Sequence, residues 1–480
     1  MSDHFPVVII GAGPAGLTAA YELVRQGVPA LVLEKADKVG GIARTETYKG
    51  YHFDIGGHRF FTKVAEIQHL WEDMLGDEFL VVPRLSHMYY RDRFFRYPLD
   101  AFDALSKLGP VEGLRILLSY FRARLRPSRT EDNFEEWVTN RFGRRLYEAF
   151  FKTYTEKVWG IPCHQISAEW AAQRIAGLSL TATITHALSG RTQAKSLIGQ
   201  FHYPLRGPGM MWQRFQQSVE GQGGQVWLGA EALRLQRDGS RIVGVEVQHC
   251  GVIRRVTADH FISTMPLPDL IGRLDPPPPV RVVQAVSQLT YRAFILVGLI
   301  VKRADLFPDQ WIYIHSPGLK VGRVQNFKNW SSAMVPDPAT TGLGMEYFCN
   351  EGDAVWQLPD AALIELARRE SVALGLVRAG DVVDGVVYRQ PAAYPVYDGT
   401  YREALGSIQA FLATLTNLQT IGRNGMHRYN NMDHSMLTAM LAVKNLRGEA
   451  HDLWSVNMEQ THHEARTVPR RIEGQVEGES

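Results

Sequence analysis

The feature that most constrains the fold of this chain is the glycine-rich sequence GAGPAG near its N-terminus. An apolar run at residues 7–10 precedes it, and apolar residues at helical spacing follow over residues 17–26. A second apolar run, at residues 30–33, ends at Glu34. The order strand, glycine turn, helix, strand predicts a βαβ unit in which Gly11, Gly13 and Gly16 have the spacing GxGxxG.

Each of these glycines has a physical role in binding a dinucleotide. Gly11 permits a tight turn, Gly13 lets backbone N–H groups approach a pyrophosphate, and Gly16 allows the helix to pack closely on the strand. The helix N-terminus adds positive potential for the phosphates. Glu34, at the end of the second strand, is placed to accept hydrogen bonds from the adenosine ribose. The sequence therefore predicts an α/β protein with a Rossmann-like dinucleotide-binding domain.

A second glycine-rich region indicates which dinucleotide is bound. Two glycine pairs follow Glu34, namely Gly40-Gly41 and Gly56-Gly57. A nicotinamide enzyme does not need them, whereas a flavin that lies deep across the domain needs close backbone approach near its ring system. GGIART resembles the FAD-binding segment of the glutathione-reductase-like flavoproteins, which implies that Arg44 contacts the pyrophosphate. His58 follows the second pair, and we expect it to contact the FAD. The alternatives are a surface arginine and a structural histidine.

The rest of the chain predicts three intermingled parts. After about residue 99 glycine is sparse, and apolar residues recur at helical spacing. Strand-like runs return at 226–263, and a proline run at 276–279 marks a linker. We therefore expect a FAD-binding domain made of residues 1–98, 201–275 and 401–448, a helical insertion at 99–200, an antiparallel-sheet substrate domain at 276–400, and a polar tail at 449–480.

Motifs further along the chain resemble those of the UDP-galactopyranose mutases. YTEKVWG, at residues 154–160, and the arginine of AAQRI closely resemble one segment of that family. Shorter similarities occur in GRVQNFKNW, MEYF and AAYPVYD, and IGR…YNNMDHSM resembles the closing FAD segment. On these matches the resemblance assigns substrate contacts to Tyr154, Trp159, Arg174, Arg323, Tyr347 and Tyr394, and FAD contacts to Arg423, Asn431 and Met432.

The resemblance also implies a reaction. In these mutases the N5 atom of reduced flavin is the nucleophile, and pyranose and furanose forms of a nucleotide-diphosphate sugar are interconverted, as in the synthesis of cell-surface polysaccharides. The expected reductant is NAD(P)H. Arg174 and Arg323 would clamp the diphosphate, since guanidinium groups form forked, charge-assisted bonds to phosphate oxygens. With His58, Tyr347 and Tyr394 they form the predicted catalytic set.

Two other functions stay open at this point. The first is a true FAD oxidoreductase of the amine-oxidase, protoporphyrinogen-oxidase or desaturase type, with an apolar cavity and no diphosphate clamp. The second is a flavin-binding structural or regulatory protein without turnover. For each substrate residue taken alone, an ordinary salt bridge or aromatic packing is an equally good interpretation.

Composition excludes several classes of protein. Lys plus Arg (52) nearly cancels Asp plus Glu (50), so the net charge of +2 gives no reason to expect nucleic acid or an anionic membrane as a partner. Cys163, Cys250 and Cys349 are too widely separated for a disulfide framework, and no histidine spacing indicates a metal site. No segment has the roughly 18 continuous apolar residues of a membrane span, and no signal peptide is recognisable. We expect a cytoplasmic enzyme with a small-molecule substrate, and allow for a homodimer.

Overall fold

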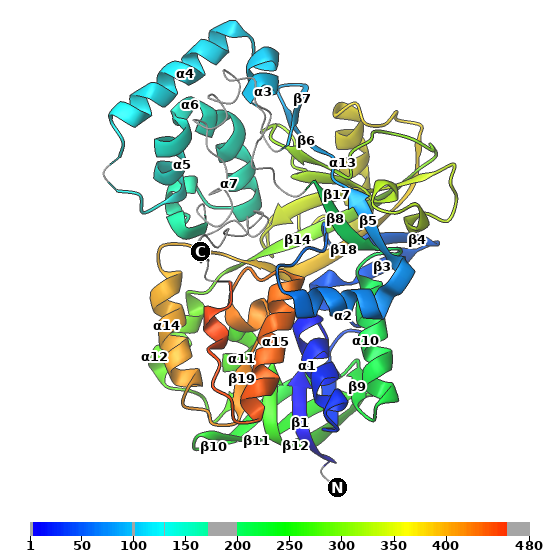
Figure 1. The fold of residues 1–480 in the computed structure, drawn as a ribbon, viewed down its shortest axis with the longest axis vertical. Coiled ribbons are helices and arrows are strands. Elements are labelled where there is room, and N and C mark those ends of the chain that lie inside the picture. Colours follow the sequence, from blue (N-terminus) through cyan, green and yellow to red (C-terminus); the bar gives the residue numbers. More distant parts are fainter. Residues whose placement is uncertain (1–2, 98–100, 129, 171–198, 458–480) are drawn as a thin grey trace, which may run out of the picture.

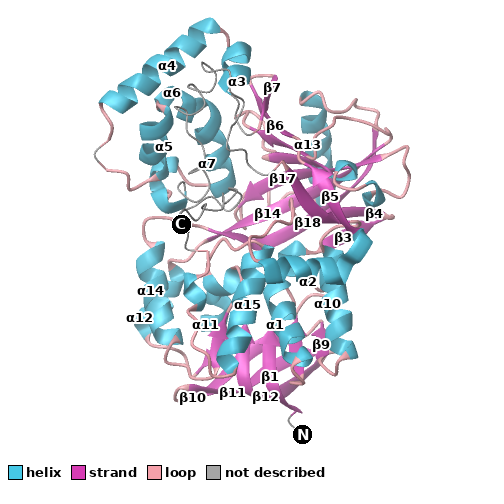
Figure 2. Cartoon of the chain, viewed as in Figure 1, coloured by secondary structure: helices cyan, strands magenta, loops and turns pink. Residues whose placement is uncertain are grey.

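The computed structural model describes residues 3–97, 101–128, 130–170 and 199–457. Arg174 and the polar residues after 457 lie outside these ranges. The described part contains two large sheets, two small two-stranded sheets and the helices that pack on them. A separate group of helices lies at the end of the molecule opposite the N-terminus (Figure 1). Figure 2 shows that helices and strands are interleaved throughout the lower half, as expected for an α/β fold.

The first sheet contains the predicted βαβ unit. Its eight strands are β1 (Asp3–Ile10), β2 (Ala30–Glu34), β9 (Gln225–Leu228), β10 (Glu231–Asp238), β11 (Arg241–His249), β12 (Val252–Ser263), β13 (Leu274–Asp275) and β19 (Leu418–Thr420). The order is β13-β10-β11-β12-β1-β2-β9, with β19 beside β12. The central strands β12, β1, β2 and β9 are parallel, and β10, β11 and β12 form an antiparallel meander.

Alternate residues of β1 face two different cores. Val7 and Ile9 pack with helices α1 (Pro14–Arg25), α2 (Ala65–Leu75), α10 (Gly209–Gly221) and α15 (Met432–Leu446). Val8 and Ile10 share a core with α11 (Leu267–Gly272), α12 (Val280–Ser287) and α14 (Tyr401–Leu412). A strand that is buried on both faces has a continuous apolar sequence, which explains the run at residues 7–10.

The second sheet is mainly antiparallel. Its strands are β6 (Ser86–Tyr90), β7 (Arg93–Arg96), β14 (Tyr291–Val301), β15 (Trp311–Ile314), β16 (Arg323–Asn326), β17 (Thr341–Cys349) and β18 (Val382–Pro395), in the order β18-β14-β17-β16-β15-β6-β7. Helix α13 (Asp360–Ala373) packs on one face through Leu363 and Ala367. Two smaller pairs complete the strands: β3 (Thr45–Tyr48) with β4 (Tyr51–Asp54), and β5 (Phe79–Pro83) with β8 (Gln200–Pro204).

Helices make up most of the described part of residues 99–200, the range predicted as a helical insertion. It contains α3 (Ala101–Leu108), α4 (Pro110–Leu125), α5 (Phe134–Phe142), α6 (Arg144–Tyr147) and α7 (Thr153–Trp159), with a π-helical turn at Glu148–Lys152. Aromatic residues of α5 to α7 share a core with the second sheet. No helix in the described ranges is both long enough and apolar enough to cross a membrane.

One predicted boundary differs from the structure. The predicted first segment of the FAD-binding domain, residues 1–98, includes strands β6 and β7. In the structure these strands belong to the second sheet, because β6 pairs in parallel with β15. A short sequence of apolar residues does not reveal which distant strand it pairs with. The rest of the division into domains stays a prediction.

Candidate functional site

A cavity of about 1180 Å³ is lined by residues of both sheets and of the helical region. Gly11 and Glu34 come from the first sheet, Tyr394 from the second sheet, and Tyr154 from α7. Typical ligand pockets have volumes of roughly 300–1,000 Å³. The cavity therefore has room for a large cofactor and a second molecule.

The GAGPAG turn forms one end of this cavity. Gly11 has a φ of +104°, and a Cβ atom there would lie 2.0 Å from Oγ1 of Thr264. A Cβ on Gly16 would lie 1.9 Å from the carbonyl oxygen of Gly11. At Gly13 the nearest atom to such a Cβ is Cα of Gly41, at 3.9 Å, so a side chain there would enter the cavity and not the protein. The two glycine-rich segments thus meet as a bare backbone cradle, which fits the pyrophosphate part of a dinucleotide.

The two charged residues predicted for this end already have protein partners. The carboxylate of Glu34 accepts hydrogen bonds from the backbone N–H groups of Ala12 (2.7 Å) and Ala36 (2.9 Å). Arg44 donates to Glu46 (2.6 Å) and to the carbonyl oxygen of Gly41 (2.8 Å). Both residues line the cavity. These bonds hold their side chains in place, and their roles toward FAD stay predictions.

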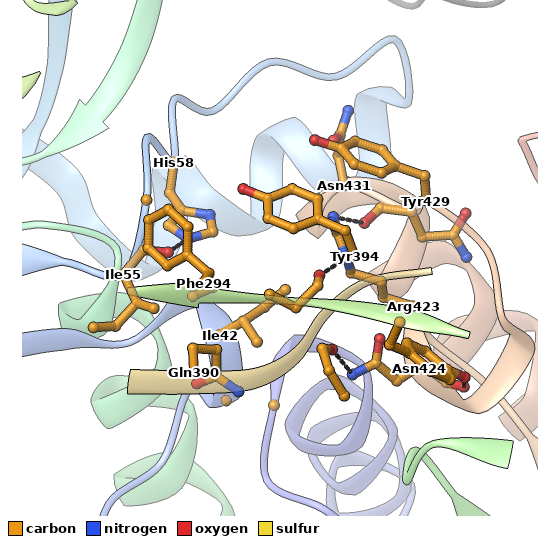
Figure 3. A pocket seen from close by; sticks show the side chains of 18 of the residues that line it. Ile42, Ile55, His58, Phe294, Gln390, Tyr394, Arg423, Asn424, Tyr429 and Asn431 are labelled. Carbon is orange, nitrogen blue, oxygen red and sulfur yellow. Dashed lines mark hydrogen bonds between the residues drawn. The ribbon is translucent and has the colours of Figure 1, made fainter. Parts of the chain in front are cut away.

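His58 lies on the cavity wall beside the second glycine pair. Its Nε2 atom donates a 2.8 Å hydrogen bond to the carbonyl oxygen of Ile55, as Figure 3 shows. Burial and the charges of Arg423 and Arg323 together lower its pKa to about 4, against the opposing effect of the bond to Ile55. His58 is therefore a neutral imidazole at pH 7.

Arg323 is a largely buried cation on the cavity wall, with 17% of its side chain exposed. Its Nε donates to Glu346 at 2.5 Å, and Gln325 donates to the other oxygen of the same carboxylate at 2.8 Å. Burial lowers the pKa of Arg323, but the electrostatic effects of Glu346 and of the neighbouring tyrosines together outweigh it, so the net direction is upward. Burial raises the pKa of Glu346, against the lowering effect of Arg323. Nη2 of the same guanidinium would lie 3.9 Å from a Cβ atom on Gly56, and Gly56 also lines the cavity.

Aromatic rings surround this cation. Tyr154 stacks on His315, with ring centres 5.0 Å apart. Trp159 meets Tyr394 edge to face at 6.4 Å and lies tilted to Tyr429 at 6.2 Å. Burial raises the pKa of Tyr154 and Tyr394 well above the usual value, so both keep their hydroxyl protons. Each can donate a hydrogen bond without adding a charge.

Tyr394 and Tyr429 stack on each other, and Arg423 lies over both rings. Its guanidinium lies 4.0 Å from the ring centre of Tyr429 and 4.9 Å from that of Tyr394, and its Nε donates to the carbonyl oxygen of Ala393 (Figure 3). In the described part of the chain, no acidic side chain forms an ion pair with Arg423. Its charge is therefore available to an anion in the cavity.

The N-terminus of α15 also faces the cavity. Asn431 caps this helix: its side chain accepts from the backbone of the first turn, and its own N–H donates to Nδ1 of His434 at 3.3 Å. Asn431, Met432 and Asp433 line the cavity. Free N–H groups at a helix start attract electronegative atoms. The contact of Asn431 and Met432 with the FAD stays a prediction.

Tyr347 does not reach the cavity, contrary to the prediction. Successive side chains of a strand point to opposite faces. On β17 the neighbours Glu346 and Phe348 face the cavity side, so Tyr347 packs against α13, where its hydroxyl donates to Glu370 at 3.1 Å. The short match MEYF identified a tyrosine but gave no information about which face of the strand its side chain occupies. Arg174 lies outside the described residues, so the structure gives no account of its predicted clamp.

Two residues of the site were missed in the sequence. Glu346 holds Arg323, and Tyr429 completes the aromatic wall. Tyr429 stands two residues before Asn431 in the closing segment, so its position was a usable signal. Nothing near Glu346 marks it as the partner of Arg323, because the pairing depends on the register of β16 and β17. Among the described residues no three His, Cys, Asp or Glu side chains gather as a metal site, and the expected absence of a metal stays a prediction.

The Rossmann βαβ unit, the bare glycine cradle and the cavity together define a dinucleotide-binding protein. The model of the family described as flavin containing amine oxidoreductase matches residues 14–402, which is more than half of the chain. The chain belongs to this family, and it binds flavin.

Solved structures and curated relatives agree with this family. A reduced UDP-galactopyranose mutase has a TM-score of 0.82 and 24% identity, covering 96% of this chain and 99% of the mutase. A wild-type putrescine oxidase with bound putrescine has a TM-score of 0.62 and 19% identity, covering 94% and 100%. At these identities the likeness concerns the fold alone.

Matches to curated proteins are short. The inactive all-trans-retinol 13,14-reductase of Danio rerio is 48% identical over 54 residues, which are 11% of this chain and 9% of that protein. The putrescine oxidase of Kocuria rosea is 41% identical over 68 residues, 14% of each chain. The chain thus spans only a small part of the length of these relatives, and their activities do not transfer to it.

Proposed function

We propose that this protein is a flavin-dependent mutase that interconverts pyranose and furanose forms of a nucleotide-diphosphate sugar. The observation that carries the proposal is the buried guanidinium of Arg323 on the cavity wall, held by Glu346 and surrounded by the hydroxyl-bearing rings of Tyr154 and Tyr394. Arg423, which the resemblance assigns to the FAD, lines the same cavity. A guanidinium group with neutral hydroxyl donors beside it suits an anionic ligand such as a diphosphate.

The same observation argues against an amine as substrate. An amine oxidase must admit a substrate that is mostly a cation at neutral pH, and like charges repel strongly where water is excluded. Arg323 is held by Glu346 at the cavity wall, whereas the resemblance assigns Arg423 to the FAD. An amine bound beside the Arg323 guanidinium would be disfavoured. A nucleotide sugar would instead gain hydrogen bonds from it.

When bound, reduced FAD would supply the nucleophilic chemistry of the proposed reaction. The chain's own residues would orient the substrate and stabilise the charge on the departing diphosphate. Arg323 would hold the diphosphate oxygens, with Tyr154 and Tyr394 as neutral donors. Trp159 would pack against the sugar or the base. His58, neutral at pH 7, would stand between the flavin and the substrate without adding charge. We extend the clamp to Arg174 on the family resemblance alone.

The competing function is that of an FAD oxidoreductase, which the names of several relatives support. The experiment that separates the two is a panel of UDP- and other nucleotide sugars, incubated with dithionite-reduced holoenzyme and analysed by chromatography. A mutase converts its substrate over many turnovers without consuming reductant stoichiometrically. An oxidase works from the oxidised form and consumes one acceptor in each turnover. No isomer from any nucleotide sugar, together with acceptor-dependent turnover of an amine, would overturn the proposal.

A further inference from the structure

Helix α4 carries a stripe of large apolar side chains that face solvent. It runs along the outer edge of the helical region in Figure 1. The exposed fractions of its side chains are high for apolar residues: Val111 65%, Leu114 59%, Leu118 61%, Phe121 57% and Leu125 82%. Their spacing of three and four residues puts them on one face of the helix. Such a stripe is costly in water, which marks it as an interaction surface.

The opposite face of α4 is firmly packed. Ile116 and Tyr120 are buried in the helical region. The backbone of Tyr120 comes so close to Gly143 that a Cβ there would lie 2.7 Å from the Tyr120 nitrogen. The helix that carries the apolar stripe is therefore packed against the helical region through its other face.

Charge along α4 shows what kind of partner the stripe fits. Exposed arginines flank it, namely Arg115, Arg122, Arg124 and Arg126. The helix has one acidic residue, Glu112, and that carboxylate already lies near Arg115 (3.5 Å) and Arg145 (3.6 Å). An apolar stripe flanked by arginines is the pattern of a helix that lies in the interface of an anionic bilayer.

We propose that α4 docks this protein onto an anionic membrane surface, with the five apolar side chains in the interface and the arginines against the lipid phosphates. The helix has 16 residues and lies along the surface of the fold, so it binds the bilayer from one side. The net charge of +2 for the whole chain gives no hint of this, because the cations on this face are balanced by acidic residues elsewhere.

A second copy of the chain is a poorer occupant of the same face. Two α4 helices packed stripe to stripe would bring four arginines of one copy against four of the other, with no unpaired acid on the helix to compensate. Like charges across an interface oppose association. A bilayer that contains anionic lipid offers the opposite charge.

The test is sedimentation of the flavin-loaded protein with vesicles of phosphatidylcholine alone or of phosphatidylcholine with phosphatidylglycerol. We expect binding to the anionic vesicles, weakening with salt. The double variant Leu118→Glu with Phe121→Glu should lower the partition coefficient roughly tenfold or more. Arg122→Gln and Arg124→Gln should each lower it roughly fivefold. The readout needs no turnover, so it stands independently of the proposed function.

A matched control uses an apolar pair on another face. Val252 (53% exposed) and Ile253 (63% exposed) begin β12, far from α4 in Figure 1, and their replacement by glutamate should leave vesicle binding unchanged. Flavin absorbance and the unfolding temperature check that each variant is folded. The proposal is overturned if the wild-type protein ignores anionic vesicles. It is also overturned if the protein is a dimer in solution that the Leu118→Glu, Phe121→Glu variant converts to a monomer.

Discussion

Arg323 donates a 2.5 Å hydrogen bond from Nε to Oε2 of Glu346, a carboxylate with no exposure to solvent. Gln325 satisfies the other oxygen. A buried ion pair of this kind adds little net stability, because desolvation offsets the attraction. The ion pair instead fixes the position of Arg323 at the cavity wall. The bond to Glu346 uses only Nε, so the terminal N–H groups of the guanidinium can donate to a ligand.

The first prediction concerns this pair. Arg323→Ala alone would leave Glu346 buried without a partner, at a cost of about 3–5 kcal/mol in stability. The double variant Arg323→Met with Glu346→Gln avoids that cost and should stay folded with full flavin content. It should bind a nucleoside diphosphate roughly 10- to 150-fold more weakly, since a charge-assisted bond contributes about 1.5–3 kcal/mol. Titration with UDP, followed by flavin fluorescence, measures the loss.

Arg323→Lys is the companion variant. It keeps the charge but loses the fork, so it should restore only part of the affinity. Wild-type affinity for UDP in the double variant would show that Arg323 is no part of an anion site. The main support for a nucleotide-sugar substrate would then be lost.

A second prediction uses two glycines of one turn. Gly13 has ordinary backbone angles and open space beside it, whereas Gly16 is pressed against the carbonyl of Gly11. Gly13→Val should therefore give a folded but colourless protein, because the side chain occupies the place of the pyrophosphate. Gly16→Val should impair folding itself. Absorbance near 450 nm, an ordinary property of oxidised flavin, and the circular dichroism spectrum separate the two outcomes. A yellow Gly13→Val protein would show that the pyrophosphate does not lie against the glycine cradle.

The third prediction compares two tyrosines that the family resemblance treats alike. Tyr347→Phe removes a buried hydrogen bond to Glu370, so it should lower stability by about 1–3 kcal/mol without altering UDP binding. Tyr394→Phe removes a donor on the cavity wall and should lower kcat/KM for the sugar with little effect on stability. Thermal unfolding and the nucleotide titration together test both. A strong loss of UDP affinity in Tyr347→Phe would contradict the strand face assigned to it.

These contrasts show how far the sequence reaches. The βαβ unit follows from local patterns, since spacing and apolar runs are properties of neighbouring residues. Family membership confirms the flavin that GAGPAG and the glycine pairs predicted. The ion pair of Arg323 with Glu346 was out of reach, because it depends on how two strands align. The same holds for the pairing of β6 with β15.

The site shows a second limit of sequence. Motif matching names residues but not the directions of their side chains, which is why Tyr347 was misplaced while its neighbour Glu346 was overlooked. A strand places adjacent residues on opposite faces, so an error of one position reverses the interpretation. Arg423, Asn431 and His58 do line the cavity, since glycine turns and a helix start fix their surroundings locally, while their contacts with FAD stay predictions.

The last prediction concerns the pH dependence of stability. Asp54, at the end of β4, is buried and accepts hydrogen bonds from Tyr203 (2.5 Å) and Thr45 (2.7 Å). Burial raises its pKa to about 7, and the two hydrogen bonds only partly oppose this. A group whose pKa is higher in the folded state contributes stability that is fully present below its unfolded pKa. That contribution is lost as the pH rises through the folded value.

For Asp54 this window runs from about pH 4 to about pH 7, and over it the folded protein should lose roughly 4 kcal/mol from this residue, at about 1.4 kcal/mol for each pH unit. The buried histidines His58, His315 and His427 act in the opposite direction, because burial lowers their pKa values and acid removes their contribution. The measurement must therefore compare wild type with Asp54→Asn, which stays uncharged at every pH. We expect the unfolding temperature of the variant to rise relative to wild type between pH 5 and pH 8. Parallel profiles for the two proteins would mean that Asp54 ionises in its ordinary range, and that the Tyr203 and Thr45 hydroxyls fully compensate its burial.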